Sequence, residues 1–263
     1  MDFEAGEVIS FDKPYGWTSF DVVARVRGIV RRYLGVKKIK VGHAGTLDPL
    51  ATGVLIVCTG KATKTIDTLQ AETKEYVATL KLGATTPSFD METAEDATFP
   101  TGHITPESVQ EVLKQFVGTI EQIPPAYSAL KVDGERSYKL ARKGEEVTLK
   151  PKTLVIDEIE MLDFGHAQDS ENSECTENSE CSENSGKGYL RLVIRVVCSK
   201  GTYIRALARD IGVALGSGAY LTALRRTRIG DRRIEDCTTV EAFENMVDKL
   251  PSIKKEIISK KIL

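Results

Sequence analysis

The chain has 263 residues, of which 41% are hydrophobic and 28% are charged. This composition excludes wholesale disorder and a small disulfide-stapled scaffold. No apolar run reaches the roughly 18 residues that a membrane span requires, and the N-terminus Met-Asp-Phe-Glu is acidic where a signal peptide is basic. The five cysteines form no CxxC pair, which suits a reducing compartment. We therefore expect a cytoplasmic protein with free thiols.

The formal net charge of −2 conceals an uneven distribution of charge. Residues 167–186 read AQDSENSECTENSECSENSG, with six acids and no base. They hold almost no apolar residue to bury, so we expect a disordered loop inserted between two strands. Lys and Arg number seven, with no acid, over 22–46, and ten, against two acids, over 191–233. Charge runs are usually solvated surface, but these two could form one phosphate-binding face.

Hydrophobic periodicity predicts helices and strands in an irregular order. Strands show short apolar runs or strict alternation, and helices show apolar residues three or four apart. Because the two kinds do not alternate regularly, the pattern favours an α+β fold over a doubly wound parallel sheet. In chain order we expect a strand at 7–11, a helix over 20–34, strands at 54–58 and 74–82, a helix over 106–117, strands at 154–162 and 189–197, and helices over 202–215 and 240–250.

Capping residues and burial patterns refine some of these elements. Thr18 or Ser19 is the expected N-cap of the first helix, and Gly35 ends it. The second helix buries Val117 on its apolar stripe and stops at Gly118. In the strand at 74–82 the alternation places Tyr76 on the apolar face, pointing inward or into a cleft.

Several common sites are absent from the sequence. The stretch GVLIVCTGKA at 53–62 fails the GxxxxGK[ST] pattern of a phosphate loop at two positions. The three histidines lie about 60 residues apart without the spacing of a zinc site, and no GxSxG is present. We therefore expect neither a metal nor a cofactor.

Two segments retain candidates for chemistry. In VGHAGTLDPLATG, at 41–53, glycines allow close backbone approach and Pro49 holds Asp48 away from helical geometry, so that a lone carboxylate is presented on a constrained loop. In CSKGTYIRALARDIG, at 198–212, Tyr203 and Arg205 begin a helix, where amides and a guanidinium could hold an anion. An Asp-Pro turn and an ordinary capped helix explain the same residues, and taken singly they are the commoner explanations.

The order of six motifs along the chain is more specific than any one of them. They are FDKPYGWTS (11–19), VGHAGTLDPLATGVL (41–55), KEYVATLKLG (74–83), IPPAYSALKVDGERSYKLARKG (123–144), CSKGTYIRALARDIG (198–212) and LTALRRTRIG (221–230). Together they closely resemble the bacterial tRNA pseudouridine-55 synthase family, TruB, over about residues 7 to 233 apart from the acidic repeat.

The resemblance implies a pseudouridine synthase fold, with a mixed, mostly antiparallel central sheet flanked by helices and loops. It also implies an isomerase that converts the uridine at position 55, in the T stem-loop of tRNA, to pseudouridine. The base is flipped out, the glycosidic bond is cleaved and C5 is joined to the sugar. Asp48 resembles the family's essential aspartate, and Arg205 the arginine that pairs with it. Whether Asp48 acts on C1′, C2′ or C6 stays open.

Other residues match the family's substrate-binding positions. His43 resembles the histidine that stacks in the loop when the nucleotide is flipped out, and Tyr76 the tyrosine that stacks on the uracil. Tyr203 resembles the tyrosine that lines the pocket, and Leu224 an apolar residue that closes it. Lys64 is also matched to the family, with a less certain role in substrate binding.

Longer family members continue into a C-terminal PUA-type RNA-binding domain, whereas about 30 residues follow Arg233 here. We therefore expect a single catalytic domain over 1–263, acting on tRNA as a monomer without a membrane or an obligatory protein partner. The alternatives are a non-catalytic RNA-binding protein, a synthase for another uridine, and one working inside a guide-RNA particle. The four matched residues Asp48, Tyr76, Tyr203 and Arg205 argue against the first, and the short C-terminus against the last.

Overall fold

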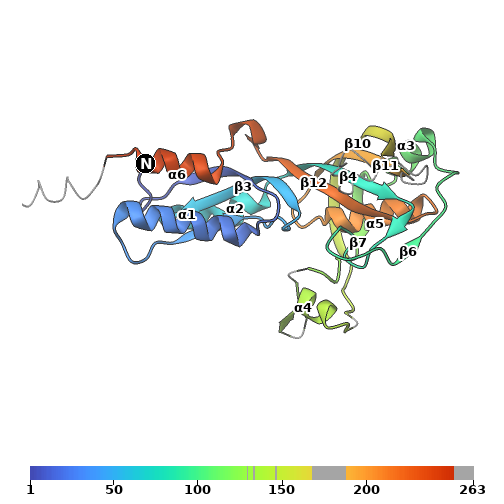
Figure 1. Ribbon diagram of the computed structural model, residues 1–263, viewed down its shortest axis with the longest axis horizontal. Helices are drawn as coiled ribbons and strands as arrows, with labels where there is room; N and C mark the ends of the chain where they lie inside the picture. Colours follow the sequence, from blue (N-terminus) through green and yellow to red (C-terminus); the bar gives the residue numbers. More distant parts are fainter. Residues whose placement is uncertain (129, 133, 146, 168–187, 252–263) are drawn as a thin grey trace, which may run out of the picture. The chain divides into compact units, whose positions relative to one another are not determined.

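The computed structural model describes residues 1–251 except 129, 133, 146 and 168–187 (Figure 1). The chain divides into two compact units. Unit 1 comprises Met1–Tyr76 and Leu224–Leu263, and unit 2 comprises Val77–Ala223. Strands β4 (Lys74–Leu82) and β12 (Ala219–Ile229) contribute residues to both units.

Unit 1 is built on strands hydrogen-bonded in the order β1-β3-β12, with β2 paired to β3 and β13 to β12. Strand β3 is antiparallel to β1 and β2 but parallel to β12, which makes the sheet mixed. The strands not yet given bounds are β1 (Val8–Lys13), β2 (Val41–Ala44), β3 (Ala51–Thr59) and β13 (Arg232–Arg233).

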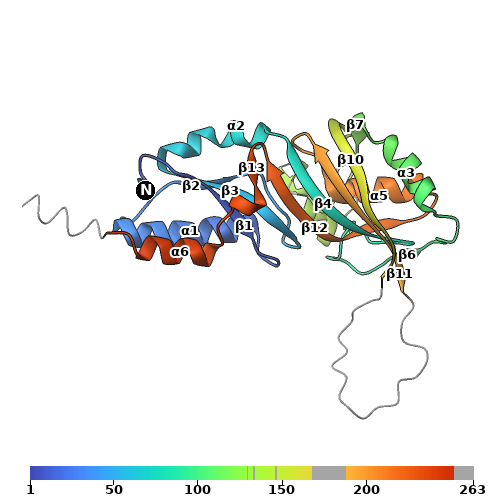
Figure 2. The ribbon, with the colours of Figure 1, turned by 90° about the horizontal axis from the view of Figure 1, so that it is seen from above.

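Helices cover both faces of these strands. Helices α1 (Ser19–Leu34) and α6 (Val240–Asp248) lie side by side on one face, and α2 (Ile66–Ala71) lies on the other (Figure 2). The short 3₁₀ helices η1 (Gly60–Thr65) and η2 (Ile234–Asp236) complete the unit. Alternate residues of β1 and β3 join two separate apolar clusters, one beneath α1 and α6 and one on the face of α2.

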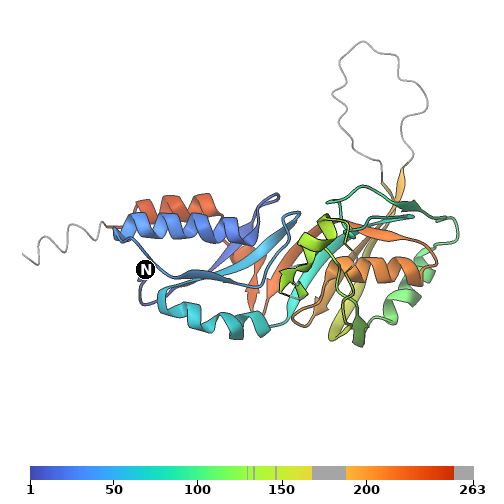
Figure 3. The ribbon, with the colours of Figure 1, turned by 90° about the horizontal axis from the view of Figure 1, so that it is seen from below.

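Unit 2 contains strands in the order β12-β4-β11-β10-β7. Helix α3 packs against β10 and against α5, and α5, drawn in orange, lies along the strands of this unit (Figure 3). The helices are α3 (Pro106–Lys114), α4 (Ser137–Arg142) and α5 (Ile204–Ala214). The strands are β5 (Ala84–Thr85), β6 (Ala97–Thr98), β7 (Gly118–Gln122), β8 (Lys131–Val132), β9 (Glu135–Arg136), β10 (Lys152–Ala167) and β11 (Tyr189–Cys198).

Most predicted elements are confirmed, including the α+β class and the strand at 74–82 with its alternating burial. Helix α1 has Thr18 as its N-cap and a left-handed Gly35 at its end. Strands β10 and β11 pair antiparallel on either side of the acidic repeat, whose predicted disorder lies outside the described residues. The three cysteines in the described part, Cys58, Cys198 and Cys237, are not joined in disulfide bonds. No helix there is long and apolar enough to cross a membrane.

The predicted end of the second helix is wrong. Helix α3 stops at Lys114, the Val117 side chain is 50% exposed, and Gly118 opens β7. The amides of Gln115, Phe116 and Val117 bond carbonyls three residues back. A turn with three residues per repeat rotates its side chains away from a stripe that has a period of 3.6, so the apolar stripe ends one turn earlier than the sequence indicates.

Candidate active site

Asp48 lies on the loop that joins β2 to β3, residues 45–50, called here the Asp48 loop. Helix α1 holds the backbone of this loop through Ser19. The Ser19 hydroxyl accepts a hydrogen bond from the Leu47 amide at 2.8 Å and donates one to the Leu47 carbonyl at 3.1 Å. The Asp48 carbonyl accepts from the Ala51 amide at 3.1 Å, which closes the turn into β3. The loop is therefore anchored on both sides of the Asp48 side chain.

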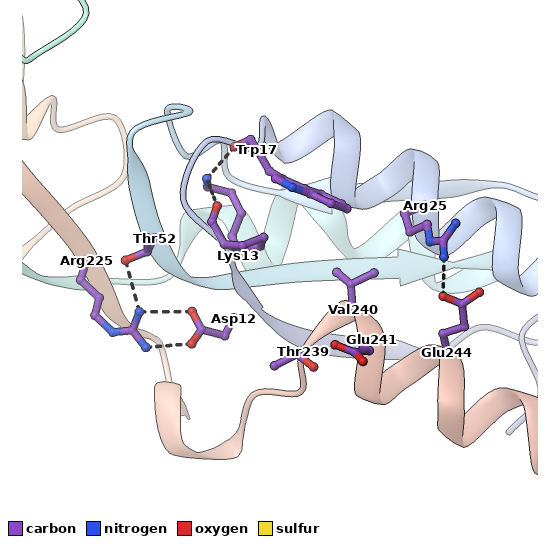
Figure 4. Close-up of a pocket in the computed structure, with 11 residues that line it drawn as sticks. Asp12, Lys13, Trp17, Arg25, Thr52, Arg225, Thr239, Val240, Glu241 and Glu244 are labelled. Atoms are coloured by element: carbon purple, nitrogen blue, oxygen red, sulfur yellow. Dashed lines mark hydrogen bonds and ion pairs between the residues drawn. The ribbon is translucent and has the colours of Figure 1, made fainter. Parts of the chain in front are cut away.

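A buried lysine supplies another anchor. The Lys13 ammonium donates to the Trp17 carbonyl at 2.6 Å (Figure 4) and to the carbonyls of Pro14 at 2.9 Å and Pro49 at 3.3 Å. Burial lowers the pKa of Lys13 to about 8, the negative charge of Asp48 opposes this shift, and the nearby Arg226 adds to it. Lys13 therefore remains charged at neutral pH, within electrostatic range of Asp48.

Lys13 also lines an open pocket of about 700 Å³ within unit 1 (Figure 4). Ion pairs join Arg225 to Asp12 at 2.8 Å and Arg25 to Glu244 at 2.6 Å along its wall. Because its three cations face three carboxylates, the pocket has no net charge that would favour a phosphate. The lining residues are Asp12, Lys13, Pro14, Trp17, Arg25, Thr52, Arg225, Thr239, Val240, Glu241 and Glu244.

The other predicted residues of unit 1 lie on three strands. His43 on β2 pairs with Val57 of β3 and is half-buried. Burial, aided by the positive charge of Arg226, lowers the pKa of His43, so its imidazole is neutral at pH 7. Tyr76 on β4 is 8% exposed, in agreement with its predicted inward direction. Leu224 on β12 pairs with Ala51, three residues after Asp48.

Lys64 is the predicted residue that the fold keeps apart from Asp48. It is exposed on η1, which follows the far end of β3. Strand β3 has nine residues, and at about 3.3 Å per residue its two ends lie on the order of 25 Å apart. Lys64 therefore lies far from the loop that carries Asp48.

In unit 2 the start of α5 carries Tyr203 and Arg205, as predicted. Tyr203 is the N-cap, and its amide donates to the Gln122 side chain at 2.9 Å. The Arg205 side chain is only 5% exposed. Its guanidinium donates to the carbonyls of Ser88 at 3.1 Å and Tyr127 at 2.9 Å. The backbone of two loops therefore fixes its orientation.

A loop that sequence reasoning missed completes this arrangement. Asp90, 6% exposed, forms an ion pair with Arg205 at 3.6 Å and accepts hydrogen bonds from the Ser88 hydroxyl and the Glu92 amide. Phe89, which lies between Ser88 and Asp90 in the chain, has a left-handed φ of 62°. Such a value is rare for a bulky residue and is typical of functional loops. No local pattern marks Asp90, because its partner lies 115 residues away in the chain.

Two family models match consecutive parts of the chain. The model described as "TruB family pseudouridylate synthase (N terminal domain)" matches residues 31–204. The model described as "tRNA pseudouridylate synthase B C-terminal domain" matches residues 205–258. The chain is 62% identical over 249 residues to the tRNA pseudouridine synthase B of Phocaeicola vulgatus, covering 95% of this chain and 96% of that protein. It is 61% identical, with the same coverage, to that of Bacteroides thetaiotaomicron.

Solved structures share the fold at lower identity. The chain matches a protein in the archaeal box H/ACA sRNP Nop10-Cbf5 complex with a TM-score of 0.59 and 28% identity, covering 93% of this chain and 54% of that one. It matches another in a Cbf5-Nop10-Gar1 complex with a TM-score of 0.61 and 31% identity, covering 92% and 54%. The chain thus spans about half the length of these solved chains. On the family models and the close relatives, the chain belongs to the TruB family of pseudouridylate synthases.

Proposed function

We propose that the protein is a tRNA pseudouridine synthase that acts on uridine 55 of the T stem-loop, with Asp48 as its essential carboxylate. The reaction class rests on the family and on relatives of about 60% identity, which are named tRNA pseudouridine synthase B. The observation that carries the role of Asp48 is the construction of its loop. The residues flanking Asp48 are tied down by buried polar side chains, which presents one carboxylate in a defined place.

The chemistry needs little beyond that carboxylate and a snug pocket. The N1–C1′ bond of uridine breaks, the uracil turns, and a C5–C1′ bond forms. The hydrogen on C5 leaves as a proton and N1 takes one up, so the atoms balance without a redox partner or an added group. Asp48 attacks C1′, removes a proton from C2′ or attacks C6, and these three routes remain open.

Arg205 is proposed as the partner of the Asp48 carboxylate. An arginine fork matches a carboxylate in shape, and a cation within about 4–6 Å favours the ionised form. Support comes from unit 2 alone, where Asp90 and two carbonyls orient the guanidinium. Because Asp48 and Arg205 belong to different units, their pairing stays a prediction that a double-mutant cycle tests.

The remaining residues are assigned to the flipped nucleotide. Extruding a base costs a few kcal/mol, and stacking on an aromatic ring returns roughly 1–3 kcal/mol per base. A neutral His43 suits stacking in the emptied loop, and Tyr76 and Tyr203 suit the uracil, with Leu224 closing the pocket. Exposed Lys64 is assigned to the phosphate backbone, which such proteins bind largely by shape.

A role inside a guide-RNA particle is the main alternative, since the solved neighbours come from such complexes. We favour a monomer acting alone in the cytoplasm, because relatives about twice as identical to this chain are named for tRNA. Mapping pseudouridine in tRNA treated with the purified protein separates the two. Modification at position 55 without added guide RNA supports the proposal, and modification elsewhere or none contradicts it.

Asp48→Asn tests the proposed carboxylate. Joining C5 to the sugar expels the C5 hydrogen, so RNA carrying tritium at C5 releases label once per turnover. We expect no release by Asp48→Asn, with melting temperature and RNA affinity close to wild type, and wild-type release by Asp67→Asn on exposed α2. Release by Asp48→Asn at one percent of the wild-type rate, with host enzyme excluded, would remove Asp48 from the chemistry.

A further inference from the structure

Arg226, on β12, is the largest fully buried side chain in the described part of the chain, with 1% exposure. A guanidinium is rarely taken out of water, because the lost hydration is recovered only where its N–H groups find good acceptors. Arg226 lies in the matched motif at 221–230, but neither periodicity nor the resemblance assigned it a role. Its partners therefore indicate why the fold buries it.

All the hydrogen bonds of the Arg226 guanidinium go to backbone carbonyls. Nε donates to Val54 at 2.7 Å, Nη1 to Thr46 at 3.3 Å and Nη2 to Gly45 at 3.1 Å. Gly45 and Thr46 begin the Asp48 loop, whereas Val54 lies in β3 beyond the end of that loop. One planar group thus ties the entrance of the loop to the strand that follows it.

The backbone around Arg226 is shaped for this approach. In the parallel register of β12 and β3, Arg226 pairs with Gly53. Gly53 has φ +105°, and a Cβ there would lie 2.2 Å from the Arg226 carbonyl oxygen. A side chain at position 53 would therefore push β12 away and move the guanidinium from its acceptors.

We propose that Arg226 is a positioning residue for Asp48, holding the start of the Asp48 loop in place while Ser19 holds Leu47 and Lys13 holds Pro49. This rests on the proposed function of Asp48. The guanidinium reaches these carbonyls through three different nitrogen atoms held in one plane, whereas a lysine at position 226 has a single ammonium nitrogen at the end of a flexible stem. The positive charge of Arg226 reaches both ends of this region, since it helps to lower the pKa of Lys13 and of His43.

The adjacent Arg225 provides a matched control. Its side chain points to the opposite face of β12, is 42% exposed and pairs with Asp12 at 2.8 Å (Figure 4). It also donates to the Thr52 hydroxyl, so in the described part of the chain its hydrogen bonds go to Asp12 and Thr52 and not to residues 45–50. The change Arg→Lys at 225 and at 226 is chemically the same, but only the second reaches the Asp48 loop.

The test compares Arg226→Lys with Arg225→Lys in steady-state tritium release from a T stem-loop, well below both melting temperatures. We expect kcat to fall at least thirtyfold for Arg226→Lys, with KM and RNA affinity within threefold of wild type. Arg225→Lys should keep kcat within twofold. Turnover of Arg226→Lys within threefold of wild type, or an equal loss of RNA affinity, would overturn the proposal.

Hydrogen exchange separates positioning from general stability. In Arg226→Lys the amides of Leu47 and Ala51 should exchange more than tenfold faster, while that of Ile56 in β3 is unchanged. Equal acceleration at all three amides would mean that Arg226 only stabilises the unit. If Arg226→Lys does not fold, hydrogen exchange of the same three amides in the wild-type protein provides the test. Leu47 and Ala51 must then exchange within tenfold of Ile56, and a thousandfold faster exchange overturns the proposal.

The outcomes also distinguish this inference from the proposed function. If Asp48→Asn stays active, the proposed function fails, although Arg226→Lys would still loosen Leu47 and Ala51. If Asp48→Asn is inactive while Arg226→Lys is active with a loosened loop, only the positioning role fails.

Discussion

The Asp48 loop in unit 1 and the surroundings of Arg205 in unit 2 use buried cations in opposite ways. In unit 1 the buried cations Lys13 and Arg226 donate to backbone carbonyls of the loop, and the carboxylate is the group presented. In unit 2 the buried cation is itself the candidate functional group, and Asp90 and two carbonyls hold it. Buried cations thus support the loop that carries the candidate catalytic group in unit 1, whereas in unit 2 the buried cation is itself a candidate functional group.

This difference predicts where a single substitution is most harmful. Removing Lys13 or Arg226 leaves backbone carbonyls without a hydrogen-bond donor. Removing the carboxylate of Asp90 instead leaves the buried Arg205 guanidinium without its counter-charge. The second loss is the more costly, because an uncompensated ion in a protein interior costs more than an unmet neutral acceptor.

The largest loss of stability is therefore expected from Asp90→Asn. The amide can still accept from the Glu92 N–H but leaves the Arg205 guanidinium without its ion-pair partner in unit 2. We expect unfolding to become easier by about 3 kcal/mol, and turnover to fall more than tenfold. Denaturant melts and tritium release measure the two. Asp96→Asn, on an exposed carboxylate of the same unit, should stay within about 0.5 kcal/mol. Equal effects of the two variants would contradict the comparison.

The pH dependence of kcat tests whether the charge of Lys13 supports the Asp48 loop in unit 1. The pKa of Lys13 is about 8, so Lys13 is protonated below that pH and loses its charge as the pH rises through it. The neutral amine has one N–H fewer for its three carbonyls and no charge beside Asp48, so kcat should decline above about pH 8. In Lys13→Met, which cannot titrate, kcat should be low throughout and the alkaline decline should disappear. A decline that persists in Lys13→Met belongs to another group.

A smaller effect is expected from Ser19→Ala. The change removes both hydrogen bonds to Leu47 in a buried place, at a cost of about 1–3 kcal/mol, and we expect a several-fold fall in kcat. Thr18→Ala is the matched control. It removes the N-cap of α1 at a cost of about 1 kcal/mol without touching the Asp48 loop, so kcat should be unchanged. A similar fall in kcat for Thr18→Ala would mean that stability, rather than the loop, controls turnover.

The smallest effect is expected from the acidic repeat. Replacing residues 169–185 with a short Gly/Ser linker should leave fold and turnover nearly unchanged. Removing its acidic charges should slightly tighten RNA binding, because like charges repel phosphate over roughly 8 Å at physiological salt. Salt-dependent binding and kcat/KM measure this, and a more than tenfold loss in kcat/KM would reveal a function in the repeat.

The sequence by itself determined the elements whose signals are local. Helix α1 begins at a threonine cap and ends at Gly35, and β4 shows strict alternation, so neighbouring residues suffice to specify them. It also singled out Asp48, because a glycine-rich Asp-Pro segment constrains its own backbone. The family resemblance rested on the order of such segments.

Only the tertiary structure decided which charged residues become buried. In the sequence Arg225 and Arg226 are equivalent, yet one is only partly buried and pairs with Asp12 while the other is enclosed by carbonyls. Asp90 likewise acquires its partner from far along the chain. Lysine, arginine and aspartate are almost always exposed, so hydropathy patterns predict that they lie on the surface. Their burial depends on acceptors that distant segments bring together, and no local pattern encodes those acceptors.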